Sequence, residues 1–156
     1  SQVKTVLITN ASMFHRPRVQ KGLEILDANQ GEIWAKLDAG TEEYYRLIER
    51  TPIPFQRILD NLAAAAQVRP LVIQSLFMLV DGEPPSDQER LAYCDRLNEI
   101  TAAGGQIQLV QIYTLARKPA ESSVGALSNA ETDRLAQLVR DRAGLPTSVY
   151  YGAAIP

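Results

Sequence analysis

Two charged residues spaced two positions apart, Lys36 and Asp38, are the first candidates for chemistry in this sequence. If they lie in a strand, their side chains point to the same face of the sheet. A lysine beside a carboxylate favours the charged forms of both groups. At a binding site, Asp38 could accept hydrogen bonds from ribose hydroxyls, and Lys36 could orient a carboxylate or donate a proton. The alternative is a structural ion pair, buried or at the rim of a sheet.

Two glutamines, Gln74 and Gln111, interrupt apolar runs further along the chain. A buried amide needs hydrogen-bond partners. These positions therefore indicate either a polar cavity or two amides that satisfy each other or a loop backbone.

Loop residues and single aromatic or sulfur-bearing side chains complete the set. Asn10 follows the first apolar run and is either a ligand contact or a turn residue. Arg117 could bind an anionic group of a substrate, or could be a solvated loop residue. Trp34 is interpreted as a strand packing residue, and Cys94 as a core residue of a helix.

The elements that would position these residues follow from the apolar periodicity. Alternating strands and helices predict an α/β fold with parallel strands and right-handed crossovers. The polar candidates fall at the carboxyl ends of strands, where such folds bind ligands. The predicted strands are residues 3–9, 32–37, 71–80, 106–115 and 148–151, and the predicted helices are 18–28, 41–50, 55–67, 86–103 and 128–142.

The length and composition limit the class of protein. The 156 residues fit one domain, residues 1–156. A complete eight-unit barrel takes roughly 250 residues, which leaves an open doubly wound sheet or a partial β/α barrel of about four to five units. The net charge of −2 does not favour nucleic acid, and no apolar run approaches the ~20 residues of a membrane helix. One histidine and one cysteine cannot form a zinc site, and a single cysteine fits a reducing cytoplasm.

Four segments, in order, resemble consecutive barrel strands of radical S-adenosylmethionine (radical SAM) enzymes. VLITNAS resembles the third strand, which often ends in Thr-Asn-Gly or Ser-Asn-Gly, with Ala11 here in place of the glycine. AKLDAGTEEYYRLI resembles the fourth-strand segment of the branch related to wyosine-synthesis enzymes. PLVIQSLFM resembles the fifth strand and VQIYTLARKPAES the sixth, so the resemblance covers nearly the whole chain.

The resemblance implies a parent enzyme that uses a [4Fe–4S] cluster to cleave SAM to a 5′-deoxyadenosyl radical. The family's Cys-x-x-x-Cys-x-x-Cys loop and its Gly-Gly-Glu type motif do not occur here. We therefore expect a fragment that lacks the first two β/α units, binds no cluster and is inactive alone. The alternative is a non-catalytic α/β ligand-binding or regulatory module.

The resemblance also implies roles for particular residues. Asp38, with Gln74 or Ser75, would face the SAM ribose, and the backbone from Tyr113 to Leu115 would face the adenine. Asn10 and Lys36 would lie toward the methionine or the substrate. Gln111 and Arg117 are candidates for substrate contacts, and no metal ligand is expected in this chain. A truncated barrel would leave strand 3–9 as an exposed edge, which we expect to pair with another chain or to be shielded by a terminus.

Overall fold

The computed structural model describes residues 3–152. Strands and helices alternate along them, which confirms the predicted α/β fold. The elements are β1 (Val6–Thr9), α1 (Pro17–Ala28), β2 (Glu32–Lys36), α2 (Glu42–Glu49), α3 (Phe55–Val68), β3 (Leu71–Leu76), β4 (Met78–Val80), α4 (Asp87–Ala102), β5 (Ile107–Tyr113), β6 (Val124–Ala126), α5 (Asn129–Ala143) and β7 (Thr147–Tyr150).

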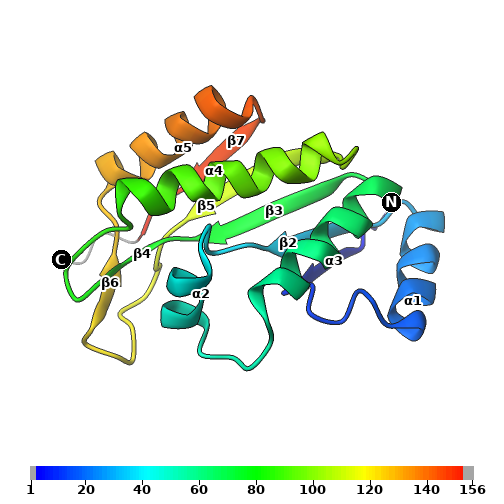
Figure 1. The fold of residues 1–156 in the computed structure, drawn as a ribbon, viewed down its shortest axis with the longest axis horizontal. Coiled ribbons are helices and arrows are strands. Elements are labelled where there is room, and N and C mark those ends of the chain that lie inside the picture. Colours follow the sequence, from blue (N-terminus) through cyan, green and yellow to red (C-terminus); the bar gives the residue numbers. More distant parts are fainter. Residues whose placement is uncertain (1–2, 153–156) are drawn as a thin grey trace.

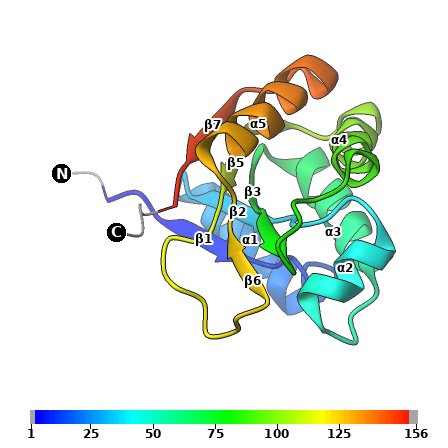
Figure 2. The same cartoon turned by 90° about the vertical axis from the view of Figure 1, so that its left-hand side faces the viewer.

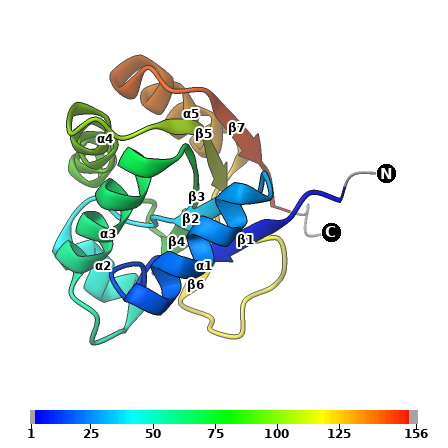
Figure 3. The same cartoon turned by 90° about the vertical axis from the view of Figure 1, so that its right-hand side faces the viewer.

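Five strands form one parallel sheet in the order β1-β2-β3-β5-β7 (Figure 1). Because this order follows the chain, right-handed crossovers place the helices on one face of the sheet. Figure 2 shows them as an arc around one side, and Figure 3 shows α1 beside α3 from the opposite end. The arrangement is that of a partial β/α barrel that is not closed, and not that of a doubly wound sheet.

Side-chain caps fix the starts of three helices. Thr41 accepts a hydrogen bond from the Tyr44 amide at α2, and Ser86 accepts one from the Glu89 amide at α4. Ser128 caps α5 in the same way. Each side-chain oxygen satisfies an amide that has no partner within the helix. These starts agree with the predicted helices.

The prediction of one continuous strand over residues 71–80 is wrong. β3 ends at Leu76, and β4 then leaves the parallel sheet to pair antiparallel with β6. The break lies at Phe77, whose side chain is fully buried. Its ring packs edge-to-face against the ring of Tyr93, with the two ring centroids 5.0 Å apart. Residues 116–127, which lie outside every predicted strand and helix, contain the strand β6. An unbroken apolar run cannot show that its second half pairs elsewhere.

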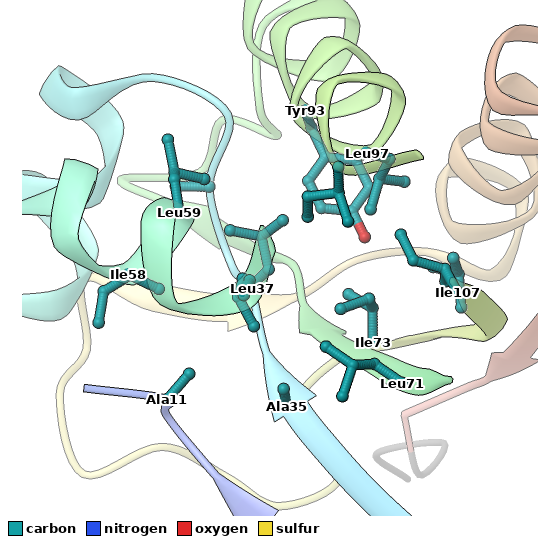
Figure 4. Close-up of a cluster of buried hydrophobic side chains, with 14 of the residues drawn as sticks. Ala11, Ala35, Leu37, Ile58, Leu59, Leu71, Ile73, Tyr93, Leu97 and Ile107 are labelled. Carbon is teal, nitrogen blue, oxygen red and sulfur yellow. The ribbon is translucent and has the colours of Figure 1, made fainter. Parts of the chain in front are cut away.

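The core lies between the sheet and the helices (Figure 4). Three buried side chains project into this core: Ala35 from β2, Leu37 from the position just after β2, and Ile73 from β3. Alternate residues on the same strands, such as Trp34 and Lys36, project to the opposite face and are only partly buried. We call that second side of the sheet the open face.

β1 is one of the two edge strands of the parallel sheet, with β2 as its neighbour. Its Ile8 side chain is 59% exposed and Leu7 is 38% exposed. The pairing of this edge with another chain, or its shielding by a terminus, stays a prediction. Across residues 3–152, no helix has the length and apolarity that a bilayer crossing requires.

Candidate functional site

A row of polar residues crosses the open face at one level of the sheet. Lys36 of β2 pairs in register with Gln74 of β3, Gln74 with Gln111 of β5, and Gln111 with Ser148 of β7. Register partners project to the same face of a sheet. The structure therefore brings together Lys36, Gln74 and Gln111, although Lys36 and Gln111 lie 75 positions apart in the sequence.

The two glutamines satisfy each other and also line a cavity. Gln74 Nε2 donates to Gln111 Oε1 at 2.9 Å. Both side chains border a hollow of about 310 Å³ on the open face. The interpretation that the two amides satisfy each other is therefore confirmed, while the cavity beside them is lined mainly by aromatic side chains. We call this cavity the aromatic hollow, and it is lined by Trp34, Gln74, Gln111, Tyr113, Thr114, Ala116, Tyr150 and Tyr151.

The aromatic hollow has the chemistry of a site for a flat ring. Its four aromatic side chains offer π faces for stacking. The amides and the Thr114 hydroxyl offer hydrogen bonds at the edge of such a ring. The sequence interpretation missed Trp34, Tyr150 and Tyr151 as lining residues. Two signals could have found them. Trp34 lies two residues from Lys36 and so shares its face of the strand, and the two tyrosines lie at the end of the last strand.

A second cavity of about 420 Å³ lies at the carboxyl ends of β1 and β2. We call it the ionic hollow because Lys36 and Glu49 border it. Lys36 lines this hollow while its register partner Gln74 lines the aromatic hollow, so neighbouring residues of one row border the two cavities. The ionic hollow is lined by Ile8, Thr9, Asn10, Lys36, Tyr45, Glu49, Thr51, Ile53 and Ile58.

Asn10 is both a turn residue and part of the ionic hollow. Its Oδ1 accepts a hydrogen bond from the Ser12 amide at 3.1 Å. Between them, Ala11 has a φ of 62°, a left-handed conformation that favours glycine. Asn61 Nδ2 donates to the Ala11 carbonyl at 2.8 Å and holds the turn in place.

Asp38 is buried, and both of its oxygens have partners. Oδ1 accepts from the Leu76 amide at 2.7 Å, and Oδ2 lies 3.5 Å from Lys36 Nζ. Burial raises the pKa of Asp38 to about 7, Lys36 opposes that shift, and the Glu49 carboxyl adds to it. The carboxyl joins the ends of β2 and β3 at the point where β3 leaves the sheet. It lines neither hollow, so the ribose contact expected for it stays a prediction.

Lys36 keeps its charge in a partly buried position. Burial acts to lower its pKa, but Asp38, Tyr113 and Glu49 more than offset that effect, and the pKa lies above its ordinary value. Tyr113 is coupled to the same group: burial raises its pKa, and Lys36 acts in the opposite direction. The ammonium is a charged donor at the border of the ionic hollow.

The loop that carries Asp38 is anchored to α4 by Glu89. Its carboxylate accepts from the Gly40 amide at 2.5 Å and from Thr41 Oγ1 at 2.6 Å. A Cβ on Gly40 would run into the backbone of Ala92 and Tyr93. The sequence analysis predicts only a helix over residues 86–103 and missed this contact across 49 residues.

The remaining candidates lie outside the row. Ser75 is fully buried on the helix side, where its Oγ and the Tyr93 hydroxyl are 2.5 Å apart. Leu115 is half-buried and Arg117 exposed, both after β5 and beside Ala116 of the aromatic hollow. The structure does not bring Ser75 to the open face, and the ligand contacts expected of these residues stay predictions.

The donor set of this chain does not fit an iron–sulfur cluster. Within residues 3–152, no three His, Cys, Asp or Glu side chains gather as metal ligands. The sequence has one cysteine, Cys94, and burial raises the pKa of its thiol to about 11, which disfavours the thiolate that ligates iron. No protein-family model matches this chain, and a search of curated proteins finds no match.

Proposed function

We propose that this chain is the carboxy-terminal part of a radical SAM barrel and supplies part of its site for SAM and substrate. The observation that carries the proposal is the polar row of Lys36, Gln74 and Gln111 on the open face of an unclosed, one-sided parallel sheet. Parallel sheets are normally covered on both faces. Here one face has no helices over it and carries polar and aromatic groups. Such a face fits the interior of a barrel whose other strands lie outside this chain.

The two hollows suit the two ends of SAM. The adenine would stack in the aromatic hollow, near the backbone from Tyr113 to Leu115. The charged methionine end would lie in the ionic hollow, where Lys36 faces the carboxylate and Asn10 offers an amide. Asp38 acts as a positioning residue, because it holds Lys36 and the end of β3 together.

Because the residues of this chain do not fit the cluster, we assign to the chain only the binding and positioning of SAM and substrate. SAM cleavage would need a cluster held outside residues 3–152, and we expect no radical chemistry from the chain alone. A reducing cytoplasm is part of the proposal, on the basis of the single buried cysteine.

A second candidate is a non-catalytic α/β module that binds a ring-containing ligand in the same hollows. The aromatic hollow favours it, since its π faces and amides suit flat rings other than adenine. The gene upstream distinguishes the two: a cysteine triad there supports the enzyme, and a native start codon just before this chain supports the module.

Trp34 provides a direct binding test, because it is the only tryptophan in the sequence and lines the aromatic hollow. We expect SAM and adenosine to quench its fluorescence, and methionine alone to leave it unchanged. Gln111→Leu should weaken adenosine binding on the order of tenfold, because it removes a buried amide contact. Gln137→Leu, an exposed glutamine on α5, is the matched control.

The substitution Lys36→Gln tests the contact with the charged end of SAM independently of the contact with the adenosine end. It should weaken SAM on the order of tenfold, as expected for the loss of one charge-assisted contact, and leave adenosine nearly unchanged. Equal affinities of wild type for adenosine and SAM would favour the module. No quenching by millimolar SAM or adenosine would contradict a SAM site on this face.

A further inference from the structure

We propose that residues 115–123 form a strap that closes over both hollows, and that the Arg50–Glu121 ion pair is its latch. The inference rests on the proposed function only in taking the hollows as the ligand site. We use "strap" for residues 115–123 throughout. In Figure 2 the strap is the yellow loop that arches out beyond the carboxyl end of the sheet between β5 and β6.

Both ends of the strap are fixed by hydrogen bonds. At one end, buried Thr114 Oγ1 accepts from the Leu127 amide at 2.8 Å. At the other, the Ser123 carbonyl accepts from the Asp81 amide at 2.7 Å, next to the β4–β6 pair. Between them Ala116, Arg117 and Lys118 are exposed. Fixed ends with an exposed middle allow the segment to swing without unfolding the sheet.

The strap borders one hollow and contacts a residue next to the border of the other. Ala116, near its start, lines the aromatic hollow. Glu121, near its end, reaches Arg50, whose neighbours Glu49 and Thr51 line the ionic hollow. The strap and its latch therefore connect the border of the aromatic hollow with the segment after α2 that borders the ionic hollow.

The latch is a two-pronged contact between parts of the chain 71 residues apart. Arg50 Nη1 and Nη2 donate to Glu121 Oε1 and Oε2 at 2.8 and 2.9 Å. Arg50 ends α2 in a left-handed conformation with a φ of 46°, which is uncommon for a non-glycine residue. The two parallel hydrogen bonds fix the orientation of the two side chains. Because both side chains are exposed to solvent, the contact is weak enough to open.

Limited trypsin digestion measures the opening without any ligand. Trypsin cleaves after Arg117, on the strap, whereas Lys118 is followed by Pro119 and resists cleavage. Glu121→Gln should raise the native-state cleavage rate at Arg117 by about 2- to 5-fold, the range expected for one exposed ion pair. Cleavage at Arg134 on α5, in the same digest, corrects for any change in global stability.

Two further variants make the result specific. The exchange Arg50→Glu with Glu121→Arg should return the Arg117 cleavage rate to that of wild type. Glu42→Gln breaks the exposed Arg46–Glu42 pair on α2 and should leave that rate unchanged. Equal rates for wild type and Glu121→Gln, or an equal rise in Glu42→Gln, would overturn the latch.

Stopped-flow quenching of Trp34 by SAM then tests what the strap closes over. Glu121→Gln should raise both the association and the dissociation rate, since ligand passes the strap in each direction. Faster cleavage with unchanged SAM rates would overturn closure over the hollows. An absence of SAM quenching would count against the proposed function, while the digestion would still decide the latch.

Discussion

The two faces of the sheet differ although the same strands build both. On the helix-covered face, Ala35, Leu37 and Ile73 are buried to 2% exposure or less. On the open face, Trp34 and Lys36 from the same strand remain partly exposed. Alternation along a strand thus separates two roles. The covered face supplies stability, and the open face supplies groups with unused capacity for contact.

The covered face extends beyond the strand ends, whereas the polar groups of the open face gather at them. Gly40 packs directly on α4, and Glu89 holds it there. Asp38, two residues earlier, lies at the boundary, buried like the core but paired with Lys36 of the open face. Substitutions on each side of this boundary therefore test the comparison.

The largest expected contrast is between adjacent residues of β3. Ile73→Ala should lower the free energy of unfolding by about 3 kcal/mol, because it leaves a cavity under the helices. Gln74→Ala should cost roughly 1 kcal/mol, mainly the hydrogen bond to Gln111. Urea unfolding monitored by circular dichroism measures both. Equal losses would show that the open face is as tightly packed as the covered one.

A contrast of similar kind concerns two glycines. Gly40→Ala should destabilise the fold by about 2 kcal/mol, because its Cβ meets α4 backbone that cannot move freely. Gly22→Ala, in α1 with open space around it, should instead stabilise by roughly 0.5–1 kcal/mol through helix propensity. Thermal melts of the two variants should therefore shift in opposite directions. A shift in the same direction would refute the close approach at Gly40.

Asp38, at the boundary between the two faces, should also make stability depend on pH. Its pKa is about 7 in the fold and 3.8 ordinarily, so the folded state binds this proton more tightly than the unfolded state does. The contribution of Asp38 to stability should therefore fall as the pH rises from about 4 to about 7 and level off above that. Asp38→Asn should remove this slope, which urea titrations between these pH values can measure.

Lys36→Gln provides the check on that assignment. Because Lys36 opposes the rise in the Asp38 pKa, its removal should extend the slope to higher pH. A slope that persists in Asp38→Asn, or that is unchanged in Lys36→Gln, would assign the pH dependence to another group.

Several features of the candidate site were predictable from local pattern. The spacing of Lys36 and Asp38 placed both near one strand end, and the apolar runs around Gln74 and Gln111 placed those amides in strands. Their common row was not predictable, because register depends on pairing between strands. The engagement of Asp38 with the Leu76 amide, across 38 residues, was also invisible to local pattern.

The sequence by itself determined the α/β alternation, the helix starts at Thr41, Ser86 and Ser128, and the chemical types available at the strand ends. These depend on periodicity and on contacts within a few residues, which local sequence encodes. Tertiary structure alone decided the break of the strand at Phe77, the anchoring of Gly40 by Glu89, and the reach of Glu121 to Arg50. Each of these depends on a neighbour from another part of the chain, and packing, not periodicity, chooses that neighbour.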